Sequence, residues 1–155
     1  MDDRFLKAVH QHQNIIHKVC RLYRNNPRDR EDLFQDIICQ LWKSFPNFRN
    51  VSLISSWIYR IALNTAMVIY RKSAIKIEYS DSFPESILST GDNSTSENEE
   101  RLYAALQILN DGDKALISLY LDDYSYAEIA SFLGISESNV GVKLNRIKSK
   151  LKSIV

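Results

Sequence analysis

Residues 126–152 run YAEIASFLGISESNVGVKLNRIKSKLK and contain the most distinctive local pattern in the chain. The small residue Ala130 allows two helices to approach closely, and Gly134 supplies a left-handed turn conformation that other residues resist. Ile135 is placed to fill the space beneath this turn, and Ser136 is the expected N-cap of the next helix. That helix repeats apolar residues at helical spacing, namely Val140, Leu144, Ile147 and Leu151. The stretch predicts a helix-turn-helix, whose second helix enters the major groove of DNA.

The opposite face of this second helix is exposed by geometry once the apolar stripe is buried. An Asn side chain can pair with adenine, a Val can contact a thymine methyl group, and Lys or Arg neutralises phosphates. The residues predicted to contact DNA are Ser138, Asn139, Val142, Lys143, Asn145, Arg146 and Lys148. A helical hairpin with a solvated basic helix is the alternative explanation of the same pattern.

The first half of the chain also has helical periodicity. We expect one helix over about residues 5–24, and a second from about Arg30 to Phe45, capped by Asp29. The second helix has one broad apolar stripe, made of Leu33, Phe34, Ile37, Ile38, Leu41, Trp42 and Phe45. After a loop over residues 46–56, Ser55 or Ser56 is the expected cap of a long helix that ends near residue 73.

The long helix combines an apolar stripe with a stripe of Asn and Arg residues. Aromatic residues lie at its start, where Trp57 and Tyr59 follow Phe48 and Arg49 of the loop. Aromatic faces stack unpaired bases, Asn reads base edges, and Arg or Lys binds the backbone, so this composition suits single-stranded DNA. The competing explanation is that Trp57 and Tyr59 belong to the core and that the basic residues form a solvated face.

The net charge of +1 conceals two basic regions on either side of an acidic one. Residues 1–76 contain 13 Lys and Arg against 6 Asp and Glu, whereas residues 77–111 contain 1 against 8. The stretch 77–98 is rich in Ser, Asp, Glu and Asn, has no Lys or Arg, and predicts a flexible acidic linker. With only 4 Gly and 3 Pro, the chain is predicted to be all-α, with two small helical domains over 1–76 and 99–155.

Several other classes of protein fit the sequence poorly. No apolar run approaches the length of a membrane span, and the start of the chain lacks the apolar region of a secretory signal. Cys20 and Cys39 lie within apolar helical patterns and are expected to be buried, reduced thiols of a cytoplasmic protein. His10, His17 and Cys20 share one side of a helix, but zinc sites usually have paired ligands at tighter spacing. With no phosphate-binding loop and no nucleophile–base set, we expect no enzyme activity, no cofactor and no metal.

Two blocks in the first half, DREDLFQDIICQLW (29–42) and FRNVSLISSWIYRIALNTA (48–66), resemble region 2 of the extracytoplasmic-function group of the sigma-70 family. The stretch 125–151 likewise resembles region 4 of that family, and the two regions occur in the family's order. The residues of the first half that match the family patterns are Asp29, Glu31, Asp32, Leu33, Gln35, Asp36, Phe48, Arg49, Trp57, Ile58, Tyr59, Arg60, Ile61, Ala62 and Asn64. The resemblance implies an alternative sigma factor, which gives core RNA polymerase its promoter specificity.

The resemblance also implies which surfaces are used. The helix from Glu31 to Phe45 would dock on the clamp helices of the largest polymerase subunit, through Asp32, Gln35, Asp36 and Gln40. A solvated acidic face is the alternative explanation of these polar residues. The -10 element would be recognised and melted through Phe48, Arg49, Trp57, Arg60, Asn64, Arg71 and Lys72. Region 4 would bind the -35 duplex and the flap of the second-largest subunit, and an anti-sigma factor is the usual regulatory partner of the group.

The sequence departs from the family pattern at the recognition helix. Where relatives commonly have Gly-Thr-Val-Lys-Ser-Arg, residues 138–143 are Ser-Asn-Val-Gly-Val-Lys, so Gly141 has no side chain where many relatives have a basic one. Asn110 follows Leu109 where the family usually has Pro, and either Asn110 or Asp111 can cap the helix that follows. A stand-alone helix-turn-helix regulator is the main competing hypothesis, and a nucleic-acid enzyme is a weaker one.

Overall fold

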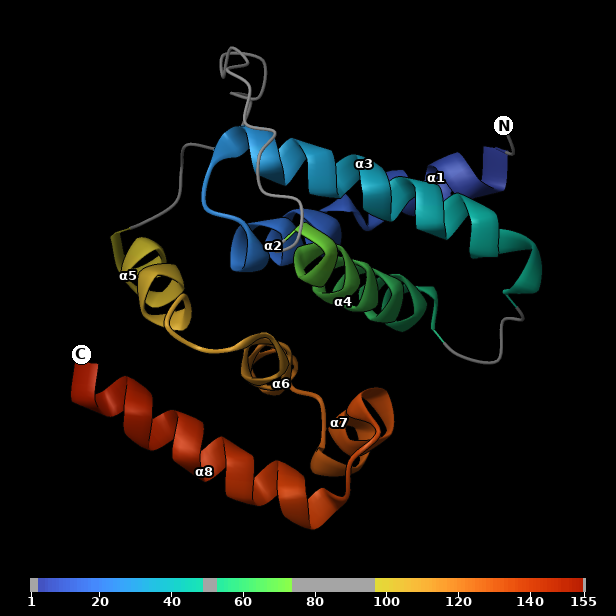
Figure 1. The fold of residues 1–155 in the computed structure, drawn as a ribbon. Helices are drawn as coiled ribbons and strands as arrows, with labels where there is room; N and C mark the ends of the chain where they lie inside the picture. The colour runs from blue at the N-terminus through green and yellow to red at the C-terminus, as the bar shows by residue number, and fades with distance from the viewer. Residues whose placement is uncertain (1–2, 49–52, 74–96, 155) are drawn as a thin grey trace. The chain divides into compact units, whose positions relative to one another are not determined.

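The computed structural model describes residues 3–48, 53–73 and 97–154, with residues 68–73 and 154 described by their backbone alone. Within these ranges the chain forms eight α-helices and one short 3-10 helix, and no strand, which confirms the all-α prediction (Figure 1). None of the helices in these ranges has the length and apolar character needed to cross a membrane. The chain divides into two compact units, Met1–Asn93 and Ser94–Val155, and each unit is described by itself.

The first unit is a bundle built around α2 (Gln13–Tyr23), α3 (Pro27–Ser44) and α4 (Ile54–Ser73), which pack against one another. The short α1 (Asp3–Gln11) precedes them, and η1 (Phe45–Asn47) continues from the end of α3. The core residues of α2, α3 and α4 that are at most 1% exposed are Ile16, Val19, Leu22, Leu33, Ile37, Leu41, Ile58, Ala62, Leu63 and Ala66. This core fixes which sides of α3 and α4 face solvent.

The single helix predicted over residues 5–24 is instead two helices, because the backbone at His12 leaves the helical conformation. The change of direction lets α1 place Phe5 in the core, where it is 1% exposed. The Phe5 ring contacts Trp42 edge-to-face at a centroid distance of 5.0 Å and Phe45 at 5.4 Å. Edge-to-face pairs of this kind are favourable beyond the area they bury, which gives a physical reason for the break.

Two predicted helix caps of the first unit were wrong. Asn26, rather than Asp29, caps α3: its Oδ1 accepts a hydrogen bond from the Asp29 backbone N–H at 2.8 Å. Pro27 then occupies the first helical position, where its missing N–H and fixed φ are tolerated. The helix α4 begins at Ile54, so Ser55 and Ser56 lie inside its first turn and are not its N-cap.

The second unit contains α5 (Glu97–Leu106), α6 (Asp111–Leu121), α7 (Tyr126–Leu133) and α8 (Glu137–Ile154). The helix α8 packs on α5, α6 and α7, and α6 buries the residues Ala115, Leu116 and Leu119 almost completely. Asn110 caps α6 by accepting from the Asp113 N–H at 2.8 Å, which confirms one of the two caps considered. The predicted linker 77–98 lies outside the described residues except for positions 97 and 98, which already belong to α5.

The two cysteines lie in different environments. Cys20 is 2% exposed, as expected, and burial raises the pKa of its thiol to about 12. Cys39 is exposed, so the expectation that both thiols are buried was wrong for Cys39. The buried stripe of α3 runs along Leu33, Ile37 and Leu41, and Cys39 lies on the other side of the helix.

This difference predicts the thiol reactivity of the folded protein. The thiolate is the reactive species, and at pH 8 a raised pKa leaves Cys20 almost fully protonated. We expect one thiol, Cys39, to react rapidly with a small thiol reagent, and Cys20 to react only after denaturation. The Cys39→Ser variant should show no fast phase. Two fast thiols in the folded wild-type protein would contradict this description of the core.

Candidate nucleic-acid interfaces

The turn between α7 and α8 has the geometry predicted for a helix-turn-helix. Gly134 adopts φ 71° and ψ 35°, a left-handed conformation that favours glycine. The Ala130 carbonyl accepts hydrogen bonds from the backbone N–H of Gly134 at 2.8 Å and of Ile135 at 3.1 Å. The Ser136 hydroxyl accepts from the Asn139 N–H at 3.1 Å, which confirms Ser136 as a cap of α8.

The buried stripe of α8 also agrees with the prediction. Val140 and Leu144 are 0% exposed and Ile147 is 1% exposed, while Leu151 is half-buried. Among the predicted DNA contacts, the exposed ones are Ser138, Asn139, Val142, Asn145 and Arg146, and Lys143 is half-buried. An exposed, mostly polar face lies opposite a sealed apolar face, the arrangement that a recognition helix needs.

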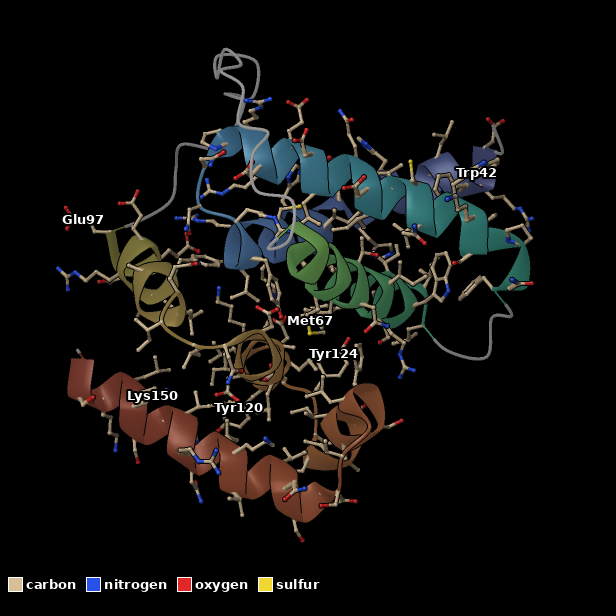
Figure 2. The ribbon with its side chains drawn as sticks, viewed as in Figure 1. Trp42, Met67, Glu97, Tyr120, Tyr124 and Lys150 are labelled. Atoms are coloured by element: carbon tan, nitrogen blue, oxygen red, sulfur yellow. The ribbon has the colours of Figure 1, made fainter. Side chains whose placement is uncertain are left out.

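Lys148 differs from the other predicted DNA contacts because it lies against α6. Its Nζ donates a hydrogen bond to the Tyr120 hydroxyl at 3.1 Å and lies 4.6 Å from the centroid of the Tyr120 ring. The hydrogen bond to Tyr120 is the main reason why the pKa of Lys148 is raised. Tyr120, on α6, is labelled in Figure 2. If Lys148 binds DNA, it does so while its ammonium group is also bonded to Tyr120.

Gly141 lies on the flank of α8 beneath Tyr126, the first residue of α7. A Cβ atom at position 141 would be 3.5 Å from Cε2 of the Tyr126 ring, which is an ordinary van der Waals distance. Tyr126 remains 40% exposed. The sequence prediction did not include Tyr126 among the DNA-facing residues, since only the packing of α7 on α8 brings it to this surface.

The aromatic residues at the start of α4 belong to a cluster with η1. The Trp57 ring lies 5.0 Å from that of Phe48 and 6.2 Å from that of Phe45, centroid to centroid, and Trp57 is half-buried. Tyr59 is only 2% exposed, with the Lys18 Nζ 5.4 Å from its ring centroid. For Tyr59, the competing explanation of a core residue was therefore the correct one.

The predicted stripe of Asn and Arg residues on α4 has two residues whose side chains the structure describes, and both are exposed. Arg60 and Asn64 are exposed one helical turn apart, and Met67, labelled in Figure 2, is half-buried. Of the remaining predicted -10 contacts, Arg49 lies outside the described residues. Arg71 and Lys72 lie in α4, but their side chains are outside the described part of the chain.

The outward side of α3 has an acidic half and an aromatic end. The predicted docking residues are all exposed, namely Asp32, Gln35, Asp36 and Gln40. Burial and, secondarily, the neighbouring Asp32 carboxylate raise the pKa of Asp36 above its ordinary value. Trp42, predicted as part of the core stripe, is 40% exposed while one edge contacts Phe5, so it lies at the margin of the core (Figure 2).

The residues considered for a metal site have structural roles. The His17 ring stacks on Phe34 at a centroid distance of 4.6 Å, and burial lowers the pKa of His17. Cys20 belongs to the core. Within the described ranges, no group of three or more His, Cys, Asp or Glu residues is placed to hold a metal ion.

Comparisons with known proteins match both halves of the chain to one family. Residues 8–74 match the family model of sigma-70 region 2, and residues 99–151 match that of sigma-70 region 4. The RNA polymerase sigma factor SigZ of Bacillus subtilis is 30% identical over 131 residues, which cover 81% of this chain and 72% of SigZ. The ECF RNA polymerase sigma factor SigM of Mycobacterium tuberculosis is 23% identical over 153 residues, which cover 97% of this chain and 76% of SigM.

Two solved structures share this fold, and one of them is a sigma factor. The sigma factor RpoE, in its co-crystal with the anti-sigma factor NepR from Bartonella quintana, superposes with a TM-score of 0.76 at 18% identity, covering 98% of this chain and 96% of RpoE. CnrH, in complex with the cytosolic domain of CnrY, gives a TM-score of 0.68 at 22% identity, covering 99% of this chain and 88% of CnrH. At these identities the likeness concerns the fold, whereas the family models and the sequence relatives establish the family. The chain belongs to the extracytoplasmic-function group of the sigma-70 family, and it is an alternative sigma factor that directs transcription.

Proposed function

We propose that this sigma factor binds core RNA polymerase through the acidic face of α3, recognises the -10 element through α4, and reads the -35 duplex through α8. In this proposal the two DNA-binding modules are residues 1–76 and 99–155, and residues 77–98 tether them. The observation that carries the proposal is the exposed face of α8, with Val142 and Arg146 opposite the sealed residues Val140 and Leu144. The protein itself catalyses no reaction in this proposal and works in the cytoplasm, where core polymerase is.

The contact with the -10 element is proposed to involve Arg60 and Asn64 together with the Phe48–Trp57 aromatic pair. Taking one base out of the stack requires a few kcal/mol. Stacking of that base on a protein aromatic ring returns about 1–3 kcal/mol. The two terms are of similar size, so a few well-placed contacts can shift the equilibrium toward a melted strand without ATP. Arg49, Arg71 and Lys72 are proposed to hold the phosphate backbone.

The acidic face of α3 is proposed to dock on the clamp helices of the largest polymerase subunit. Asp32 and Asp36 lie one turn apart, so their like charges repel. The raised pKa of Asp36 reflects partial burial first and this repulsion second. A positively charged partner would relieve the repulsion, and electrostatic complementarity of this kind favours specific association. Gln35 and Gln40 lie on the same exposed side of α3 and can add hydrogen bonds.

Two further partners are proposed on the basis of family membership. The earlier helices of the second unit, α5 and α6, are proposed to contact the flap of the second-largest subunit. An anti-sigma factor is proposed to cover polymerase-binding surfaces when transcription is not required. The complex of the sigma factor RpoE with the anti-sigma factor NepR supports this proposal by analogy.

The proposed function is tested by transcription with core polymerase and genomic DNA, with and without the protein, followed by mapping of the start sites. We expect a discrete set of start sites that depend on the protein, and little binding of the protein alone to promoter duplex. Tight binding to DNA without polymerase, together with no dependent start site, would contradict the proposal. That outcome would support a stand-alone helix-turn-helix regulator.

The Asn64→Ala variant tests the role of α4 in melting. One base-edge contact contributes about 1–3 kcal/mol, so we expect the permanganate reactivity of -10 thymines in the promoter complex to fall by at least about five-fold. Binding to core polymerase should not change. The matched control is Asn14→Ala, the same substitution at an exposed position of α2, which should leave melting unchanged. If the two variants melt the promoter equally well, Asn64 does not contact the -10 element.

The Asp36→Asn variant separates polymerase docking from stability. Because the pKa of Asp36 is raised in the folded protein, the folded state favours its protonated form, and this favourable contribution is lost as the pH rises through the folded pKa. At pH 7 the neutral Asn should therefore leave the thermal midpoint unchanged or raise it. Affinity for core polymerase should fall about ten-fold, the effect of losing one charged hydrogen bond.

A matched control for this experiment is Asp3→Asn, at an exposed position of α1. It removes the same charge from the protein and should leave the affinity for core polymerase unchanged. An equal loss of affinity in both variants would mean that overall charge, rather than the acidic face of α3, governs docking.

A further inference from the structure

Two apolar side chains are exposed on α8 and on the start of the neighbouring α7, namely Val142 and Tyr126. Val142 is 56% exposed and Tyr126 is 40% exposed, and both are among the most exposed large apolar residues of the second unit. The Tyr126 ring lies over Gly141, and Val142 is the next residue of α8. A single exposed aliphatic residue needs no explanation by itself, so the place of Val142 on the helix has to carry the argument.

The position of Val142 on α8 does not fit a structural role in the core. It precedes the buried Leu144 by two residues and follows the buried Val140 by two, so it points away from the core. Its neighbours one turn before and after on the same face are Ser138 and Arg146, which are both exposed and polar. No packing interaction within the described second unit accounts for a β-branched apolar side chain at this place.

Gly141, the residue before Val142, leaves the surface beside Val142 accessible. It has no side chain of its own, and the Tyr126 ring covers its flank without burying Val142. Lys148, which lies two turns further along the same flank, is held by the Tyr120 hydroxyl. On the exposed face Val142 therefore lies between the polar residues Ser138 and Arg146, whereas Lys143 lies on the flank opposite Gly141.

The major groove presents one apolar group to a bound helix, the C5-methyl group of thymine. The other groups at the base edges are hydrogen-bond donors and acceptors, which an aliphatic side chain cannot satisfy. An exposed aliphatic side chain in a recognition helix thus fits a thymine and disfavours a base whose polar edge would be left unpaired.

We infer that Val142 is a specificity-determining residue that contacts the methyl group of a thymine in the -35 element. The inference rests on the proposed function, since it assumes that α8 lies in the major groove of the -35 duplex. It adds the chemical identity of one base that the helix reads.

The test removes single methyl groups from the DNA. Each thymine in the -35 region of a promoter that depends on the protein is replaced in turn by deoxyuridine, which keeps base pairing and lacks only the methyl group. The affinity of the polymerase containing the full-length protein is measured for each duplex. We expect one substitution to weaken binding about four-fold, the effect of one buried methyl group, and the others to have little effect.

The same series is then measured with Val142→Ala and with a matched control, Ile108→Ala. Ile108 is 49% exposed and lies in the second unit outside α8. The Val142→Ala polymerase should bind the thymine and deoxyuridine duplexes equally, whereas the Ile108→Ala polymerase should still distinguish them as the wild type does. The thermal midpoint of Val142→Ala should not fall, because the side chain is exposed.

The outcomes separate this inference from the function on which it rests. If no deoxyuridine substitution matters, or if the effect persists in Val142→Ala, the inference is wrong. The variant Arg146→Gln then tests whether α8 binds the -35 duplex at all, because loss of a phosphate contact should weaken binding to every -35 duplex. If Arg146→Gln also leaves binding unchanged, the proposed role of α8 fails as well.

Discussion

The Ala130 carbonyl accepts two backbone hydrogen bonds, from Gly134 and from Ile135, and this interaction sets the direction in which α8 leaves the turn. The left-handed backbone at Gly134 makes both bonds possible. With the direction fixed, Val140 and Leu144 are sealed against α6 and α7, and the opposite side of α8 has to face solvent. The polar and apolar groups proposed to read DNA are exposed as a consequence of this packing.

In the first unit, too, burial of one side of a helix determines which side chains face solvent, but there the exposed residues are acidic. Burial of Leu33 and Ile37 against α2 and α4 leaves Asp32 and Asp36 together on the outward side of α3. Two carboxylates one turn apart do not stabilise a helix, which is consistent with the proposed binding role. Functional sites often contain groups that lower the stability of the fold. Here the two carboxylates lie on a surface that is proposed to bind a partner of opposite charge.

The elements that sequence reasoning predicted correctly depend on local physics, and the errors depend on packing between helices. Gly134 and Ser136 were identified because a turn and a cap are properties of a few neighbouring residues. The break at His12 was missed because its cause is Phe5 packing on distant aromatic residues of α3 and η1. Tyr59 was considered for base stacking, although Lys18 of α2 covers its ring, and Lys148 gave no sequence signal of its contact with Tyr120. The site residues themselves remain predictions, because exposure permits a contact without identifying the partner.

The central claim is that one chain uses two surfaces at once, with α3 on polymerase and α8 on duplex DNA. A photo-crosslinking amino acid placed at position 36 or at position 142 of the full-length protein tests it most directly, in a complete promoter complex. We predict that position 36 crosslinks to the largest polymerase subunit and that position 142 crosslinks to DNA upstream of the start site, only when polymerase is present. Crosslinking of position 142 to DNA with equal efficiency in the absence of polymerase, or of position 36 to no polymerase subunit, would contradict the account.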